Sequence, residues 1–355
     1  MNKIRVLIID DSMLIRKILT EILNSSPDIE VVGTATDPLI AREMIKQLHP
    51  DVLTLDIEMP HMDGITFLRN LMRLRPTPVV MISTLTEKGA EVTLEALTLG
   101  AVDFVSKPKA DVVNALSGYA DEIISKVKMA ARANVKNIEP RSLKNRETTK
   151  SPAHVNAGDA KIRKPATAIK MIALGASTGG TEAIKTVVKD LPPDTPAILI
   201  TQHLPAAFSE SFVRHIDLIT AMKASIPRHG EIVEAGHIYL APGNKHMLVI
   251  KDGTNYVIQL NDGEPVNRHK PAVDVMFRSV ARCACPNAIA VLLTGMGADG
   301  AAGMKEMHDA GAKTVIQDEQ SSVVWGMPGA AFKLGCTDYV LPLEDVSQKI
   351  VALTK

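Results

Sequence analysis

The sequence predicts an α/β protein made of two doubly wound domains with a polar segment between them. From Lys3 to about Ala133, short apolar runs alternate with amphipathic helical patterns, as a parallel sheet covered by helices on both faces requires. The same alternation resumes at Lys170 and continues along the rest of the chain. At 355 residues, the chain is long enough for two hydrophobic cores. We therefore expect one domain at 1–133 and a second at 167–355.

The first region fits five strand and helix units. Its last helix is expected from about Asp111 to Ala133. Residues 134–166 are dominated by Lys, Arg, Asn, Thr, Pro and Ser, a composition that cannot bury enough apolar surface to fold. We expect this segment to be a flexible linker. The expected strands of the first region are 4–10, 29–35, 52–57, 78–83 and 101–107.

The second region repeats the alternation around an insertion of a different kind. Residues 231–260 alternate polar and apolar positions at period two, with turn sequences Pro-Gly-Asn at 242–244 and Asp-Gly at 252–253. This pattern is typical of antiparallel strands, so we expect an antiparallel β insertion in a doubly wound α/β domain. The expected strands of the main sheet are 171–174, 197–201, 289–294, 313–317 and 339–341.

The composition argues against several classes of protein. Forty Lys and Arg residues balance forty Asp and Glu residues, so no overall charge directs the chain to nucleic acid. The apolar runs are shorter than the roughly 18 to 20 residues that span a bilayer, and the first residues enter a strand rather than a signal peptide. Three cysteines fit a reducing compartment better than a disulfide framework. We expect a cytoplasmic protein that neither binds nucleic acid nor inserts into membranes.

Acidic side chains gather at the strand ends of the first region. Asp10 and Asp11 end the first expected strand, and Asp56 lies near the end of the third. The carboxyl ends of parallel strands share one sheet edge, where three carboxylates would repel one another without a cation. Each could be a cap or turn residue if taken singly, but together they favour a Mg2+ site. Lys107 could balance charge, Ser83 could bond to a phosphoryl oxygen, and an aspartate can accept a phosphoryl group.

The first region resembles the response-regulator receiver domain. The resemblance implies a flavodoxin-like fold with a five-stranded parallel sheet. It further implies that Asp56 is the phosphoacceptor and that Asp10, Asp11 and Asp56 hold Mg2+. The sequence elements that carry it are Asp10-Asp11, Asp56, Met-Pro-His-Met-Asp-Gly at 59–64, Ser83 and Lys107-Pro108.

The same resemblance assigns roles to three more side chains. It implies that Lys107 contacts the phosphoryl group and that Ser83 is the switch hydroxyl, with Thr84 as the alternative one position later. Phe104 is implied to be the aromatic side chain that moves with the switch. The first region is therefore expected to be a phosphorylation-controlled module.

In the second region, a serine stands between glycines where a strand meets a helix. Residues 175–179 read Gly-Ala-Ser-Thr-Gly, which fits the Gly-x-Ser-x-Gly turn that presents a nucleophile above a sheet. A phosphate-binding turn and a plain chain reversal fit the motif as well. Ser177 is thus a candidate nucleophile that needs a base and an orienting carboxylate.

The candidate base and carboxylate also follow expected strands. His203 ends the run that begins at Ala197, at the same sheet edge as Ser177, whereas His269 precedes a helix and is the competing candidate. Asp299 follows the strand at 289–294 in a glycine-bearing loop, where a helix N-cap is the alternative role. Ser, His and Asp at three ends of one sheet form the arrangement that a catalytic triad requires.

The chain order Ser, His, Asp differs from that of α/β-hydrolases, and the motifs point to another family. The second region resembles the CheB family of chemotaxis protein-glutamate methylesterases. The resemblance implies a triad of Ser177, His203 and Asp299, with the backbone N–H groups of Thr178 and Met296 at the oxyanion. The motifs are Gly-Ala-Ser-Thr-Gly-Gly at 175–180, Thr-Gln-His-Leu-Pro at 201–205, Ala-Pro-Gly-Asn-Lys-His at 241–246, His-Lys-Pro-Ala-Val-Asp at 269–274 and Thr-Gly-Met-Gly-Ala-Asp-Gly at 294–300.

The resemblance carries expectations about activity and partners. It implies a phosphorylation-activated serine esterase that removes methyl groups from glutamates on the cytoplasmic part of chemoreceptors and deamidates receptor glutamines. The expected partners are methylated chemoreceptors and a chemotaxis histidine kinase as phosphodonor. Mg2+ is expected in the first domain and no cofactor in the second. The alternative is a receiver-controlled nucleotide-binding protein without esterase activity, which would need neither His203 nor Asp299.

Overall fold

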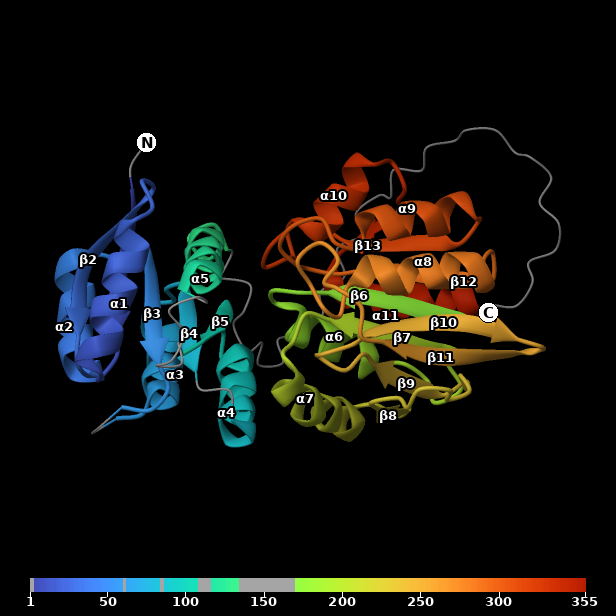
Figure 1. The fold of residues 1–355 in the computed structure, drawn as a ribbon, viewed down its shortest axis with the longest axis horizontal. Helices are drawn as coiled ribbons and strands as arrows, with labels where there is room; N and C mark the ends of the chain where they lie inside the picture. Colours follow the sequence, from blue (N-terminus) through green and yellow to red (C-terminus); the bar gives the residue numbers. More distant parts are fainter. Residues whose placement is uncertain (1–2, 60–61, 84–85, 108–115, 134–169) are drawn as a thin grey trace, which may run out of the picture.

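The computed structural model describes residues 3–59, 62–83, 86–107, 116–133 and 170–355. The expected linker lies outside these residues, as do Pro60, His61, Thr84 and Pro108. The described residues form two units, each around its own parallel sheet, which we call the N-terminal unit (3–133) and the C-terminal unit (170–355). Figure 1 shows the N-terminal unit in blue to green beside the C-terminal unit in green to red.

The N-terminal unit is a five-stranded parallel sheet in the order β2-β1-β3-β4-β5, as expected. Polar side chains begin its helices: those of Ser12, Asp37, Asp63 and Thr86 accept hydrogen bonds from first-turn N–H groups. The strand order reverses beside β1, so the carboxyl ends of β1 and β3 border the point where ligands bind in such sheets. The elements are β1 Ile4–Ile9, α1 Met13–Asn24, β2 Ile29–Ala35, α2 Pro38–Leu48, β3 Val52–Asp56, α3 Gly64–Leu74, β4 Val79–Ser83, α4 Glu87–Thr98, β5 Asp103–Ser106 and α5 Leu116–Ala130.

The C-terminal unit has a seven-stranded parallel sheet in the order β14-β13-β12-β6-β7-β9-β8. Strands β6, β7 and β12 are buried along their whole length, which explains their largely apolar sequences. The order reverses between β12 and β6, so the carboxyl ends of these strands border a second crevice. The elements are β6 Met171–Ala176, α6 Gly180–Val188, β7 Ala197–Gln202, α7 Ala206–Ile219, β8 Lys223–Ser225, β9 His237–Leu240, β10 His246–Asp252, β11 Asn255–Asn261, α8 Val273–Cys283, β12 Ala288–Leu292, α9 Ala301–Asp309, β13 Lys313–Gln317, α10 Met327–Lys333, β14 Tyr339–Leu341 and α11 Leu343–Thr354.

The structure corrects the expected insertion in one respect. Strands β10 and β11 form the antiparallel hairpin, but β9 pairs in parallel with β7 and belongs to the main sheet. All four side chains of β9 are buried, so its pattern is that of an inner parallel strand rather than an alternating one. The edge strand β8 was not expected, because three residues carry too little pattern. The last helix of the N-terminal unit ends at Ala130, three residues before the predicted end.

The two units pack together along α4, β5 and α5 of the first unit and α6 and α7 of the second. The ring of Phe104 in β5 stacks on that of Phe208 in α7, with 4.6 Å between centroids. Glu91 of α4 and Arg214 of α7 form an ion pair at 2.8 Å on the rim. An aromatic contact with a charged rim therefore joins the units.

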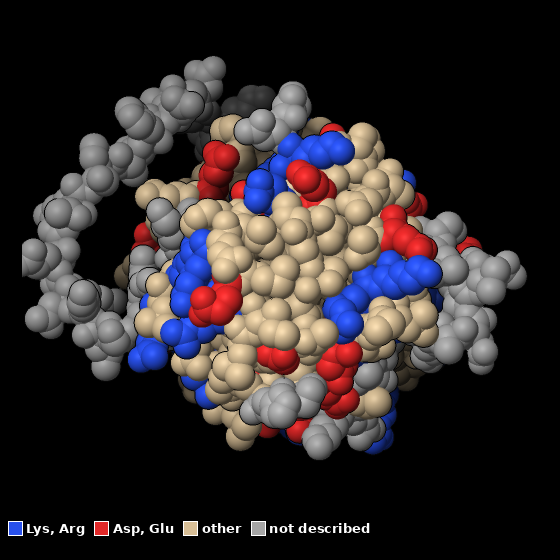
Figure 2. Space-filling model, turned by 90° about the vertical axis from the view of Figure 1, so that its left-hand side faces the viewer, with Lys and Arg blue, Asp and Glu red and all other residues tan. Residues whose placement is uncertain are grey.

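Far from this contact, α1 and α2 cover the outer end of the N-terminal unit (Figure 1). Figure 2 views the molecule from this end, where basic and acidic side chains are interspersed around an uncharged centre. Exposed apolar side chains of these helices include Met13, Leu14, Leu39 and Ile40. Among the described residues, no helix is long and apolar enough to cross a membrane.

Candidate active site and phosphorylation pocket

Strand β6 delivers Ser177 to the carboxyl edge of the seven-stranded sheet. The Ser177 N–H donates to the carbonyl of Thr294 at 3.0 Å, and its carbonyl accepts from the N–H of Gly180 at 2.7 Å. The left-handed conformation of this turn falls on Gly179, whose φ is 74°, where a side chain would be strained. The strand thus passes through a tight turn into α6 with the Ser177 hydroxyl at the crevice.

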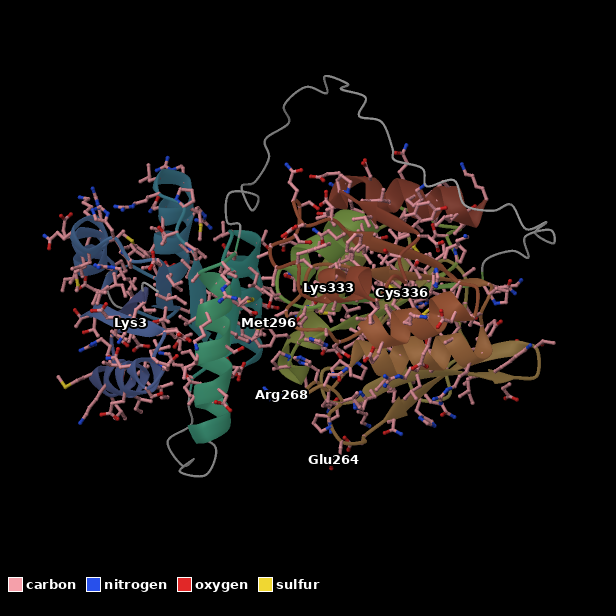
Figure 3. All side chains as sticks on the ribbon, turned by 90° about the horizontal axis from the view of Figure 1, so that it is seen from above. Lys3, Glu264, Arg268, Met296, Lys333 and Cys336 are labelled. Atoms are coloured by element: carbon pink, nitrogen blue, oxygen red, sulfur yellow. The ribbon has the colours of Figure 1, made fainter. Side chains whose placement is uncertain are left out.

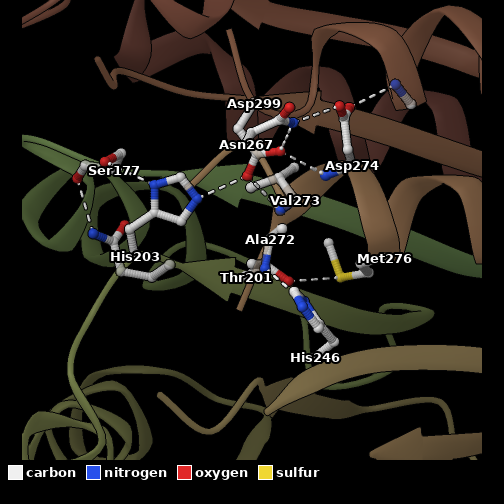
Figure 4. Close-up of polar contacts among 12 residues, drawn as sticks. Ser177, Thr201, His203, His246, Asn267, Ala272, Val273, Asp274, Met276 and Asp299 are labelled. Carbon is white, nitrogen blue, oxygen red and sulfur yellow. Dashed lines mark hydrogen bonds and ion pairs between the residues drawn. The ribbon is translucent and has the colours of Figure 1, made fainter. Parts of the chain in front are cut away.

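Ser177, His203 and Asp299 lie in one row, as Figure 4 shows. His203 Nδ1 is 3.1 Å from Ser177 Oγ, and its Nε2 is 2.8 Å from Asp299 Oδ2. The three residues follow β6, β7 and β12, which are neighbours in the sheet. The His203 side chain is only 8% exposed, so its contact with the carboxylate is shielded from water.

The carboxylate of Asp299 is held at the N-terminus of α8. Its oxygens accept from the N–H groups of Val273 at 2.7 Å and Asp274 at 3.1 Å, and from Asn267 Nδ2 at 2.8 Å. Burial by itself would raise the pKa of Asp299, but the hydrogen bond and charge of His203, with the Asn267 and Val273 donors, lower it to about 2. Asp299 therefore caps a helix as well as contacting His203, and the helix is α8 rather than the α9 that follows it.

Asn267 and Asp274 extend this row and were missed in the sequence. Asn267 Nδ2 lies 2.8 Å from both Asp274 Oδ2 and Asp299 Oδ1 (Figure 4). Asn267 has a φ of 54° and Arg268 a φ of 69°, and asparagine tolerates this left-handed region better than most residues. An asparagine in a loop was therefore the one sequence feature that could have drawn attention to this position. Nothing in the sequence predicted that the loop lies beside Asp299.

His269, the competing base, lies against His203 rather than beside Ser177. The two imidazole rings stack with centroids 3.7 Å apart and an interplanar angle of 10°. Burial, followed by the charge of a protonated His203, lowers the pKa of His269 to about 4. His269 is therefore neutral near pH 7 and presents a ring face to the other histidine.

The loop that carries Met296 comes close to Ser177. A Cβ added to Gly295 would lie 2.9 Å from Ser177 Cβ, so the glycine lets the loop that carries Met296 approach. Within the described parts of the chain, the N–H groups of Thr178 and Met296 donate to no protein acceptor. Met296 also lies at the boundary between the units in Figure 3, where its sulfur accepts from Ser125 of α5 at 3.7 Å.

A cavity of about 720 Å³ is lined by Ser177 and His203, together with other residues of both units. From the N-terminal unit, Asp103 and Phe104 of β5 and Lys126 of α5 face Ser177 and His203 across it. The Thr178 hydroxyl donates to Asp103, and Lys126 forms an ion pair with the same aspartate at 3.4 Å. The N-terminal unit therefore covers the approach to Ser177 in this conformation.

Three carboxylates lie together in an acidic pocket of the N-terminal unit. Ligand oxygens of Asp10, Asp11 and Asp56 lie within 4.8 Å of one another. Lys107 Nζ is 2.7 Å from Asp56 and 3.5 Å from Asp10. Burial raises the pKa of Asp10, and it raises that of Asp56 to about 6 against the opposing effect of Lys107. One lysine thus leaves these carboxylates short of positive charge, so the oxygen donors fit a divalent cation. Ser83 ends β4, paired with Ser106 of β5.

The two units define the class of protein: a response regulator with an enzymatic output domain. Residues 6–117 match the response regulator receiver domain, and residues 172–350 match the CheB methylesterase family. The chain belongs to the CheB methylesterase family.

Known proteins are similar to the chain over its whole length or over its C-terminal unit. A protein-glutamate methylesterase/protein-glutamine glutaminase 1 of Xanthomonas campestris is 56% identical over 99% of this chain and 97% of its own. A protein of Hydrogenovibrio crunogenus named protein-glutamate methylesterase/protein-glutamine glutaminase is 55% identical over the full length of both chains. The crystal structure of the Thermotoga maritima CheB methylesterase catalytic domain covers 53% of this chain and all of its own, with 30% identity and a TM-score of 0.52.

Proposed function

We propose that the chain hydrolyses the γ-methyl esters of glutamate side chains, with Ser177 as nucleophile, His203 as general base and Asp299 as the carboxylate that orients it. The observation that carries this proposal is the pair of hydrogen bonds through His203, at 3.1 Å to Ser177 and 2.8 Å to Asp299. The names of the Xanthomonas and Hydrogenovibrio relatives supply the substrate class.

The reaction proceeds through an acyl-enzyme. His203 Nδ1 takes the proton from Ser177 Oγ, which attacks the ester carbonyl, and the negative charge of Asp299 stabilises the imidazolium that forms. His203 then gives the proton to the methoxy oxygen, and methanol leaves. Water, deprotonated by the same histidine, hydrolyses the acyl bond and frees the glutamate and Ser177.

The oxyanion that forms at the carbonyl needs donors. Thr178 follows Ser177 and Met296 follows Gly295, which approaches Ser177 closely. Among the described residues their N–H groups have no protein acceptor, which supports their role in binding the oxyanion. A glutamine side chain would react by the same steps with ammonia as the leaving group. We expect this deamidation to be slower, because an amide is the less reactive acyl donor.

The N-terminal unit acts as a phosphorylation switch in this proposal. The receiver domain would span 1–133, a linker 134–166 and the esterase domain 167–355. Asp56 accepts the phosphoryl group, Lys107 contacts it, and Ser83 and Phe104 transmit its presence. Asp10, Asp11 and Asp56 would hold Mg2+, which when bound supplies positive charge against the phosphoryl oxygens.

Regulation follows from the covered cavity. The N-terminal unit lies over Ser177, so we propose that phosphorylation shifts the population towards a conformation in which the units separate. The donor would be a chemotaxis histidine kinase and the substrate the cytoplasmic part of methylated chemoreceptors. The proposed compartment is the cytoplasm.

A fluorophosphonate probe tests the nucleophile and the alternative of a nucleotide-binding protein. The full chain should be labelled, Ser177→Ala should not, and the exposed Ser25→Ala serves as a matched control. Equal labelling of folded Ser177→Ala and wild type would remove Ser177 from the proposal. A chain that binds nucleotide without labelling would favour the alternative.

A further inference from the structure

The peptide between Ser177 and Thr178 connects the nucleophile to the proposed oxyanion donor. A peptide bond is planar and almost always trans, and the cis bonds of the described chain precede Pro271 and Pro286. In a trans peptide, the carbonyl and the N–H point in opposite directions. Whatever holds the Ser177 carbonyl therefore also aims the Thr178 N–H.

Two donors hold that carbonyl. Gln202 Nε2 donates to it at 2.9 Å, and the N–H of Gly180 donates at 2.7 Å. The Gly180 bond belongs to the local turn, whereas the Gln202 bond comes from the end of the neighbouring strand β7. The amide of Gln202 thus ties the orientation of this peptide to the sheet that also carries His203.

The surroundings of Gln202 indicate that the bond from its amide nitrogen to the Ser177 carbonyl is the reason for a polar side chain at this buried position. The residue is 4% exposed, and its Oε1 has no hydrogen-bond partner in the described chain. A buried acceptor without a partner is costly, and an apolar side chain of the same size would avoid that cost. The amide nitrogen, which donates to Ser177, is what an apolar side chain would lack.

Gly180 makes room for the amide. A Cβ at this position would lie 2.2 Å from Gln202 Oε1 and 2.7 Å from Ala176 Cβ, both too close. Gly180 has no left-handed φ, so space, not backbone conformation, requires glycine here. Gly180→Ala would therefore displace the Gln202 amide without removing any hydrogen-bonding group.

We infer that Gln202 is a positioning residue that aims the Thr178 N–H at the oxyanion by holding the Ser177 carbonyl. This inference rests on the proposed esterase function. Gln202 Nε2 bonds to the Ser177 carbonyl rather than to its hydroxyl, so in this inference it acts through the peptide. Its contribution is made when charge develops on the substrate carbonyl, so it should affect turnover more than substrate binding.

The test uses Gln202→Met, which keeps the volume without the donor, and Gly180→Ala, which moves the amide by crowding. The full chain is assayed with a small phosphodonor and Mg2+ on a peptide that carries a glutamate γ-methyl ester. Deleting an oxyanion donor costs about 100- to 1,000-fold in kcat, so misaiming one should cost about 10- to 100-fold, with KM changed less than about twofold. Affinity for a peptide trifluoromethyl ketone, which forms a tetrahedral oxyanion adduct with serine, should fall in parallel with kcat.

Gln202→Leu provides a third variant that has no hydrogen-bonding group, and Gln259→Met on β11 controls for the substitution. Wild-type kcat in a folded Gln202→Met or Gln202→Leu chain would overturn the inference. A loss confined to KM, or to the unfolding temperature, would also overturn it. A residue with a merely structural role would leave the ratio of ketone affinity to KM unchanged. Methanol release by Ser177→Ala would instead contradict the proposed function.

Discussion

At the scale of single residues, the Ser177, His203 and Asp299 row separates roles that can be tested one by one. Ser177→Ala and His203→Ala should each lower methanol release by at least about 10,000-fold, because each removes a group that forms or breaks a bond. Asp299→Asn should retain a small residual rate, since the α8 N–H groups still hold the side chain. Turnover with purified, folded variants measures this. Full activity in either of the first two variants would contradict the triad, and an Asp299→Asn chain as inactive as Ser177→Ala would contradict the expected residual rate.

His269 makes a second prediction, on stability against pH. Burial chiefly lowers its pKa from 6.5 to about 4 in the folded chain, so the unfolded chain binds the proton more readily between these values. The contribution of neutral His269 to the free energy of unfolding is therefore fully present above pH 6.5 and is lost as pH falls towards 4. His269→Phe cannot bind this proton, so relative to wild type it should gain on the order of 1 kcal/mol between pH 7 and pH 5, after allowance for solvent screening. Urea unfolding at both pH values measures the change, and an equal difference at the two would contradict it.

At the scale of helices and strands, the sequence predicts the features that a local pattern of apolar and polar residues determines. The strands that carry Asp56, Ser177 and His203 are mostly apolar and buried along their whole length. Asp56 ends its strand and the other two side chains directly follow theirs, so both sheets and the edge of each site were predictable. The place of β9 was not, because only pairing with β7 distinguishes it from a hairpin strand. The contacts of Asn267 and His269 join the loop before α8 to Asp299 and His203, which are far away in the sequence, so no local pattern specifies them.

Close packing of β6 against α8 gives a prediction for an element. A Cβ on Gly175 would lie 2.3 Å from Val273 Cγ1, so the strand touches the helix that holds Asp299. Gly175→Ala should push the N-terminus of α8 away, destabilise the fold by about 1–3 kcal/mol and lower kcat. Gly253→Ala in the β10–β11 turn, where φ is 57° and no atom lies within 4 Å, should carry a backbone cost yet keep the activity. The two variants are compared by measuring both unfolding and methanol release. An active Gly175→Ala would show that α8 can shift without moving Asp299.

At the scale of the whole molecule, the phosphorylation pocket and Ser177 are connected through β5. Lys107 follows this strand and contacts Asp56, while Phe104 within it stacks on Phe208. A change at the pocket therefore has a short path to the surface that covers the cavity. Asp56→Asn should abolish the increase in methanol release that a small phosphodonor with Mg2+ produces in wild type. Persistent stimulation of this variant would place the phosphoacceptor elsewhere.

The charged rim of the same contact allows a test of whether the N-terminal unit restrains the esterase by covering Ser177. Glu91 and Arg214 are an exposed pair at 2.8 Å between α4 and α7, remote from the atoms that react. Such a pair contributes about 0.2–1 kcal/mol, and Glu91→Arg replaces attraction with repulsion. The docked population should fall, so methanol release without phosphodonor should rise about two- to fivefold, and the rise should shrink at high salt. Arg214→Glu added to Glu91→Arg restores opposite charges and should return the rate towards wild type. If the single variant leaves the rate unchanged, or the double variant does not reverse it, this contact does not restrain the esterase.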